Sequence, residues 1–180
     1  MATPTTLPAS FTAGQVLTAA QMNDLRGAFR VLQVVSTVKT DTFTMTSTTF
    51  ADITGLSVSI TPQSTTSKIL VIASVSVGSN ISANLAMLRL MRDSTAIFVG
   101  DAAGSRTQAS NYAAPDSAGT VVSETQMFLD SPSTTSATTY KIQIRTNLAG
   151  TATVNRSFND TDSTANARLA SSITVLEISA

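Results

Sequence analysis

The residues that could carry out catalysis are few and scattered along the chain. The sequence contains no Cys and no His, so it lacks thiolate and imidazole metal ligands and the usual general base of hydrolytic enzymes. Glu124, Asp130 and Glu177 lie on expected strands or next to expected turns, with no spacing that brings two carboxylates together as glycoside hydrolysis requires. The many Ser and Thr have no evident base to activate them. We therefore expect a protein that is not an enzyme and needs no cofactor, with a carbohydrate-active enzyme as the remote alternative.

One irregular segment has the residue types of a binding surface. Residues 100–118 are rich in Ala, Ser and Gly and also carry Arg106, Asn111 and Tyr112. Long segments of this kind are often functional, although some only connect two sheets. A cation, an amide and an exposed phenol ring would suit contact with a glycan or a protein. The alternative is that Tyr112 packs the segment onto the domain.

A second polar segment has oxygen ligands for an ion. Asn159, Asp160 and Asp162 lie at a spacing that suits Ca²⁺, but the glycine and the closing glutamate of an EF-hand loop are missing. Asn and Asp are also common turn formers. We predict no metal site here, and the residue pattern leaves ion binding open.

The composition favours an assembled protein. Of 180 residues, 42% are hydrophobic and 12% are charged, with 11 basic and 11 acidic residues. So few charges protect a monomer poorly against association, and their balance gives no sign of nucleic-acid or membrane-surface binding. No apolar run is long enough for a transmembrane helix, and the N-terminus lacks the features of a secretory signal.

Residues 31–180 predict an all-β domain. Hydrophobic residues alternate with polar ones, and Gly, Pro, Asn and Ser separate the alternating runs. We expect about eight to ten short strands, which is typical of an antiparallel sandwich or jelly roll. Residues 49–53 and 56–60 are expected to form separate strands divided at Gly55, and residues 100–118 are expected to form none.

Residues 68–77 form the strand that the domain is expected to be built around. One face carries only apolar residues, while the other begins with Leu70 and Ile72 and continues with Ser74 and Ser76. An antiparallel strand at the surface of a monomer would alternate throughout. The two apolar residues on the second face therefore need cover from a second sheet, another subunit, or both.

Residues 1–30 differ from the rest of the chain. Residues 2–10 contain Pro4 and Pro8 and predict an extended segment. A capping box of Thr18 and Gln21 then predicts the start of a short helix. Its apolar stripe consists of Met22, Leu25 and Phe29, with Leu17 placed to contact Met22. Three turns of helix do not persist alone in water, so the stripe docks either on its own β-domain or on neighbouring subunits of a larger particle.

Three segments resemble a group of short bacteriophage virion structural proteins of the tail-fibre type. They are residues 11–23, which read FTAGQVLTAAQMN, residues 88–95, and residues 170–178. The resemblance implies an N-terminal attachment segment, residues 1–30, and a β-sandwich head, residues 31–180, similar to jelly-roll or C1q/TNF-like heads and often trimeric. It implies that Phe11, Leu17, Met22, Leu25 and Phe29 anchor the protein to other virion proteins.

The location implied by the resemblance is the virion, assembled in the cytoplasm of a bacterial host. A trimeric tail-fibre or fibre-tip component in contact with the host surface is the first interpretation. A capsid decoration or head-fibre protein is the alternative within the same particle. A cellular trimeric signalling or lectin head is disfavoured because the chain has no Cys and no secretory signal.

Overall fold

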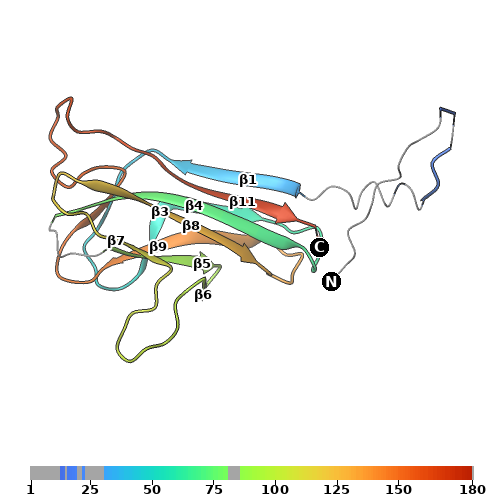
Figure 1. Cartoon of the computed structure of the whole chain (residues 1–180), viewed down its shortest axis with the longest axis horizontal. Coiled ribbons are helices and arrows are strands. Elements are labelled where there is room, and N and C mark those ends of the chain that lie inside the picture. Colours follow the sequence, from blue (N-terminus) through green and yellow to red (C-terminus); the bar gives the residue numbers. More distant parts are fainter. Residues whose placement is uncertain (1–12, 15, 20–21, 23–30, 81–85, 180) are drawn as a thin grey trace.

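Two antiparallel sheets pack face to face in the computed structural model, which describes residues 13–14, 16–19, 22, 31–80 and 86–179. Sheet A has six strands and sheet B has five, and Figure 1 shows them as two stacked layers. The all-β prediction is confirmed. Sheet A consists of β1 (Val31–Lys39), β2 (Phe43–Met45), β4 (Lys68–Ser79), β8 (Val121–Asp130), β10 (Ala152–Val154) and β11 (Ser171–Ile178). Sheet B consists of β3 (Ala51–Ile60), β5 (Ala86–Arg92), β6 (Thr95–Ile97), β7 (Asn111–Ala113) and β9 (Thr138–Thr146).

Several of the short strands of sheet A lie end to end. Along one edge of β4, β11 pairs with the first part and β10 with the last part, while β8 pairs with the other edge. β1 then pairs with β11, and β2 with β10. Sheet A therefore has the order β1/β2, β11/β10, β4, β8. Residues 155–170 leave the sheet between β10 and β11, and they form the orange-red loop at the upper left of Figure 1.

Sheet B repeats this arrangement. β5 pairs with β9 along one edge, and along the other edge with β6 and β7 in turn. β3 pairs with the free edge of β9, so the order is β3, β9, β5, β6/β7. Residues 98–110 leave the sheet between β6 and β7 and project from the lower layer, away from β1 (Figure 1).

Asn155 holds the junction of β10 and β11 together. Its side chain is fully buried, and Nδ2 donates to the carbonyl oxygens of Lys39 and Asp41 at 2.8 and 2.9 Å. Its Oδ1 accepts a 2.6 Å hydrogen bond from Ser171 Oγ. The residue has φ +65°, a left-handed conformation that Asn tolerates better than most residues. One side chain thus satisfies two backbone carbonyls where β1 gives way to β2 and bonds the Ser171 hydroxyl where β11 begins.

The core lies between the sheets, and β4 supplies its centre as predicted. The inward residues of β4, Ile69, Val71, Ala73, Val75 and Val77, are each exposed by 1% or less. They pack with the alternate residues of the opposite sheet, Leu88, Leu90, Tyr140, Ile142 and Ile144, all fully buried. The period-two alternation of the strands places one side chain in two on this inner face.

Two expectations about strand limits are wrong. Gly55 does not end a strand, because β3 continues through it with φ +82° and a shift of register between Asp52 and Ser57. Glycine adopts this conformation without strain and so allows a bulge where the sequence suggested an end. Residues 100–118 are not wholly irregular, because Asn111–Ala113 form β7 against β5.

The predicted N-terminal helix falls mostly outside the described residues. Ala19 and Met22 are helical, and the Met22 N–H donates to the Thr18 carbonyl at 3.0 Å. That single contact is one helical turn, beginning where the capping box predicts. The rest of the predicted helix stays a prediction.

Candidate functional site

The outer face of sheet A is apolar along two neighbouring rows. Val34, Leu176, Leu70 and Leu129 are paired in sequence across β1, β11, β4 and β8. The next row contains Ile72 and Met127, together with Ser36 and Thr174. Val34, Leu129 and Met127 are exposed by 57%, 53% and 60% in the single chain. The two apolar residues of β4 that the sequence marks as needing cover thus belong to a patch that spans the whole sheet.

Charge is nearly absent from this outer face. Among the outward positions of β1, β11, β4 and β8, only Lys68 is charged, and its Nζ donates to Ser131 Oγ at 2.7 Å. The other charged side chains of these four strands take inward positions. They are Lys39, Glu124, Asp130 and Glu177. The apolar rows and the lack of charge together make this surface suitable for contact with another protein surface.

Glu177 shows how sheet A holds a charge on its inner side. The residue is fully buried. Its Oε1 accepts from the Gln63 backbone N–H at 2.7 Å and its Oε2 from Gln33 Nε2 at 2.6 Å. Burial alone would raise the pKa of Glu177, but the surrounding hydrogen-bond donors, Ser67 first and then Gln33 and the Gln63 N–H, outweigh it and hold the pKa below its ordinary value. The carboxylate fastens the segment before β4 to the last strand, which is a structural role.

Asp130 and Glu124, the other carboxylates considered for catalysis, have partners of their own. Asp130 pairs with Arg92 at 2.9 Å and accepts a 2.7 Å hydrogen bond from the Tyr140 hydroxyl. Burial, followed by this hydrogen bond to a carboxylate, raises the pKa of Tyr140. Glu124 accepts from Asn111 Nδ2 at 2.7 Å. Each of the three carboxylates, Glu177 included, is therefore bound by its own partners within the protein.

The outer face of sheet B is charged instead. Lys141 pairs with Asp52 at 2.7 Å. The Cζ atom of Arg89 lies 4.0 Å from the centre of the Phe50 ring, and that of Arg145 lies 5.8 Å from it. Arg89 also donates to Gln143 Oε1 at 2.7 Å. Cations stacked on an aromatic ring keep their charge at the surface.

A groove of about 430 Å³ lies beside this charged face, within the segment between β6 and β7. The backbone N–H of Gly100 donates to the Ala109 carbonyl at 3.2 Å, and Gln108 Nε2 donates to the Gly100 carbonyl at 2.7 Å. These two bonds close the segment into a loop. The lining residues are Gly100, Asp101, Ala103, Arg106, Thr107, Gln108, Ala109, Ser110, Asn111 and Tyr112.

The groove contains the three residues that the sequence suggests as a contact patch. Tyr112 is 57% exposed, so it does not serve mainly to pack the segment onto the domain. Asn111 uses its amide within the protein, because Nδ2 donates to Glu124 and Oδ1 accepts from the Tyr112 N–H at 2.8 Å. Arg106 Nη1 makes a long hydrogen bond of 3.3 Å to the Ala103 carbonyl. Tyr112 and Arg106 therefore present the groups available to a ligand, and Asn111 positions Tyr112.

Arg145 is a groove neighbour that the sequence reasoning did not select. Its Nη1 donates to Thr107 Oγ1 at 3.3 Å, and Met87 is paired with both Arg145 and Tyr112 across three adjacent strands. The alternation of residues 139–145 placed Arg145 on an outer face. Only the strand order shows that this position adjoins the loop.

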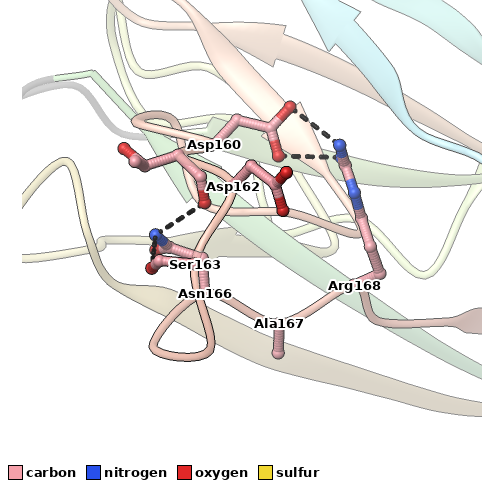
Figure 2. A pocket seen from close by; sticks show the side chains of 7 residues that line it. Asp160, Asp162, Ser163, Asn166, Ala167 and Arg168 are labelled. Atoms are coloured by element: carbon pink, nitrogen blue, oxygen red, sulfur yellow. Dashed lines mark hydrogen bonds and ion pairs between the residues drawn. The ribbon is translucent and has the colours of Figure 1, made fainter.

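A smaller hollow is formed by residues 160–168, shown in Figure 2. The figure shows Arg168 directed at the Asp160 carboxylate, with N–O distances of 2.9 and 3.0 Å. Asn166 Nδ2 donates to the Thr161 carbonyl at 3.0 Å and to Ser163 Oγ at 3.2 Å. Asp160, one of the oxygen donors considered for an ion, is thus paired with arginine. Within the described ranges, no three or more His, Cys, Asp or Glu residues group together as a metal site.

The residues expected to anchor the protein are only partly described. Leu17 and Met22 are exposed by 38% and 52%. Phe11, Leu25 and Phe29 lie outside the described residues. Among the described residues, no helix is long and apolar enough to cross a membrane.

The sequence was also compared with known proteins. No protein-family model matches it, and neither does any curated protein.

Proposed function

We propose that this chain is a non-enzymatic bacteriophage virion structural protein. In this proposal it is a homotrimeric tail-fibre or fibre-tip component, anchored by residues 1–30 and contacting the host surface with its β-sandwich head. The observation that carries the proposal is the apolar, nearly uncharged outer face of sheet A. Val34, Leu70, Leu129 and Leu176 form one row across all four strand positions. A surface of this kind on a soluble protein is typical of an interface.

The strand order supports the finer description of the fold. One sheet runs β1/β2, β11/β10, β4, β8, and the other runs β3, β9, β5, β6/β7. Counted as strand positions, successive strands thus alternate between two sheets of four positions each, except that β6/β7 follows β5 within the same sheet. Two antiparallel sheets with this alternation are the arrangement of a jelly roll. The resemblance of three segments to phage virion proteins supports the same fold and a trimeric state.

The position of Val31, where the described sandwich begins, is consistent with this assembly. Val31, where β1 begins, is paired with Ile178, and Ile178 is paired with Lys68. The apolar row containing Val34 therefore lies close to the end where residues 1–30 enter the sandwich. Copies that associate through sheet A would bring their attachment segments together. The groove belongs to the other sheet and would face outward.

The proposal is tested by oligomeric state and by location on the particle. Light scattering of the purified full chain is expected to give three times the 18.7 kDa mass of one chain, and a stable monomer at micromolar concentration would contradict the trimer. Deletion of residues 1–30 is expected to leave a folded oligomeric head that is not incorporated into particles. Imaging of labelled protein on intact phage would then distinguish a tail fibre from the alternative of capsid decoration.

A further inference from the structure

We infer that the groove beside sheet B binds an acidic glycan, with a sugar carboxylate facing Arg106 and Arg145 and a sugar ring stacked on Tyr112. This inference rests on the proposed function, because it assigns a ligand class to the surface that would contact the host. The ligand is identified by three kinds of group that the groove presents together: guanidinium groups, an exposed phenol ring and acceptors for hydroxyl groups.

The first argument is the distribution of unpaired arginines. Among the described residues five ion pairs are present, and they include Arg92, Arg156 and Arg168. None of the five includes Arg89, Arg106 or Arg145, the other arginines of the described ranges.

These three unpaired arginines lie in one region. Arg106 lines the groove, and Arg145 reaches it through Thr107. Arg89 shares the Phe50 ring with Arg145. Like charges that have no ion-pair partner repel one another, and an anion bound between Arg106 and Arg145 would remove that repulsion. Arginine is suited to this role because its planar fork binds a carboxylate through two hydrogen bonds.

The second argument is the exposed ring of Tyr112. Its exposed fraction is 57%, and the hydrogen bond from its N–H to Asn111 Oδ1 holds the backbone at this point. The C–H groups on one face of a sugar ring are apolar, so stacking them on an aromatic face buries apolar area on both partners. The two-torsion side chain of Tyr loses little conformational freedom in doing so.

Polar side chains line the groove beside the cations. Asp101, Thr107 and Gln108 line the same groove, and all three are exposed. A carboxylate, a hydroxyl and an amide can each bond sugar hydroxyls. Asp101 is the one carboxylate that lines the groove, and it faces two guanidinium groups there, those of Arg106 and of the neighbouring Arg145. A volume of about 430 Å³ is within the range of small-ligand sites.

The test measures binding of defined oligosaccharides to the purified full chain. Tetragalacturonic acid is the acidic probe and maltotetraose the neutral one, compared by calorimetry and by saturation-transfer NMR. Binding of the acidic probe is expected to be at least tenfold tighter and to weaken as salt is raised. Equal affinity for the two probes, or binding of neither, would overturn the inference.

Matched variants locate the site. Arg106→Ala is expected to weaken binding at least tenfold and Tyr112→Ala by a similar factor, while Tyr112→Phe should bind as the parent does, because the ring face makes the contact. Arg168→Ala removes an exposed arginine of the other loop and should leave binding unchanged. All of these variants are at exposed positions, and their melting temperatures are checked to be those of the parent. Full binding by both alanine variants would refute the site.

The outcomes separate this inference from the proposed function. A trimer that enters phage particles but binds neither oligosaccharide would overturn the glycan and leave the virion role standing. A monomer that enters no particle but binds tetragalacturonic acid through Arg106 and Tyr112 would overturn the virion role and leave the glycan site standing. Capture of a host-surface protein that depends on both residues, without oligosaccharide binding, would replace the glycan with a protein ligand.

Discussion

The two sheets of this sandwich carry most of their charged residues on different faces: sheet A on its inner face and sheet B on its outer face. Sheet A turns all but one of its charged residues inward, as with Lys39 and Glu177, and apart from Lys68 the outer face of β1, β11, β4 and β8 consists mostly of Val, Leu, Ile, Met, Ser and Thr. Sheet B has a mostly apolar inner face, where Arg92 pairs with Asp130 of sheet A, and carries Asp52, Arg89 and Lys141 outside. Burying a charge costs free energy even with good partners, so the arrangement in sheet A is a costly one.

The difference indicates that the two outer surfaces meet different surroundings. A face that faced only solvent would gain nothing from excluding charge, whereas a face that packs on another copy would lose stability if charges were buried there. The charged face of sheet B suits continued exposure to water. The comparison thus separates a surface for assembly from a surface for recognition within one small domain.

The largest expected effect comes from placing a charge on the apolar face. Met127→Glu should dissociate the oligomer, because an unpaired carboxylate buried in an interface costs about 3–5 kcal/mol, at least a hundredfold in dissociation constant. Met127 is 60% exposed in the single chain, so the monomer should still fold. Light scattering across a dilution series measures the change.

The matched control for this substitution lies on the other sheet. Ser57→Glu places a carboxylate at an exposed position of β3, paired with Lys141, and the oligomer should persist. If Met127→Glu assembles as well as Ser57→Glu does, sheet A is not the interface.

An intermediate effect is expected from the buried carboxylate of sheet A. Glu177→Gln should lower the free energy of unfolding by about 1–3 kcal/mol at pH 7, because an amide N–H₂ would face a donor, either Gln33 Nε2 or the Gln63 N–H. Denaturant unfolding measures the loss. A variant as stable as the parent at pH 7 would show that Glu177 does not hold this end of the sandwich.

The same substitution should also change the dependence of stability on pH. Because the folded-state pKa of Glu177 lies below its ordinary value of 4.5, its contribution is present above that value and is lost as the pH falls through the folded-state pKa. The variant should lack this part of the acid-induced loss. Glu124→Gln is the control, since burial raises the pKa of Glu124 and its removal should not reduce stability at neutral pH.

The smallest effect is expected on the outer face of sheet B. Phe50→Leu removes the ring beneath Arg89 and Arg145 and should cost about 0.5–1 kcal/mol. A double-mutant cycle with Arg89→Gln isolates the ring–guanidinium contact from the lost apolar area. A coupling free energy near zero would show that the stacked arginines are held by Gln143 and the backbone instead.

Local patterns predicted much of the fold. The alternation in residues 139–145 placed Tyr140, Ile142 and Ile144 inside, where all three are fully buried. The alternation of apolar and polar residues along a strand shows which side chains are buried. This part of the fold could therefore be predicted without knowing which strands pair with it. The outward Leu70 and Ile72 similarly pointed to the face that sheet A leaves uncovered.

Other features depend on which segments become neighbours. A glycine such as Gly55 looks the same in the sequence whether the strand ends there or contains a bulge. Only the pairing of β3 with β9 shows that the strand continues through it. No local pattern reveals the role of Asn155, because its partners Lys39 and Asp41 are more than 110 residues earlier in the chain. Arg106 and Tyr112 share one segment and were found together, but Arg145 joins them through strand order alone.

The excursion between β10 and β11 has a practical consequence for engineering. Pairing with β4 fixes the register of both strands, and Asn155 closes the junction between them. The pairing of the strands therefore does not depend on the length of the loop that joins them. The exposed tip at residues 162–165 is therefore a suitable insertion point for a foreign peptide. Doubling the length of such a loop adds only about 0.6 kcal/mol of closure entropy. In the proposed trimer, three copies of a displayed epitope would extend from the end of the head opposite the start of β1.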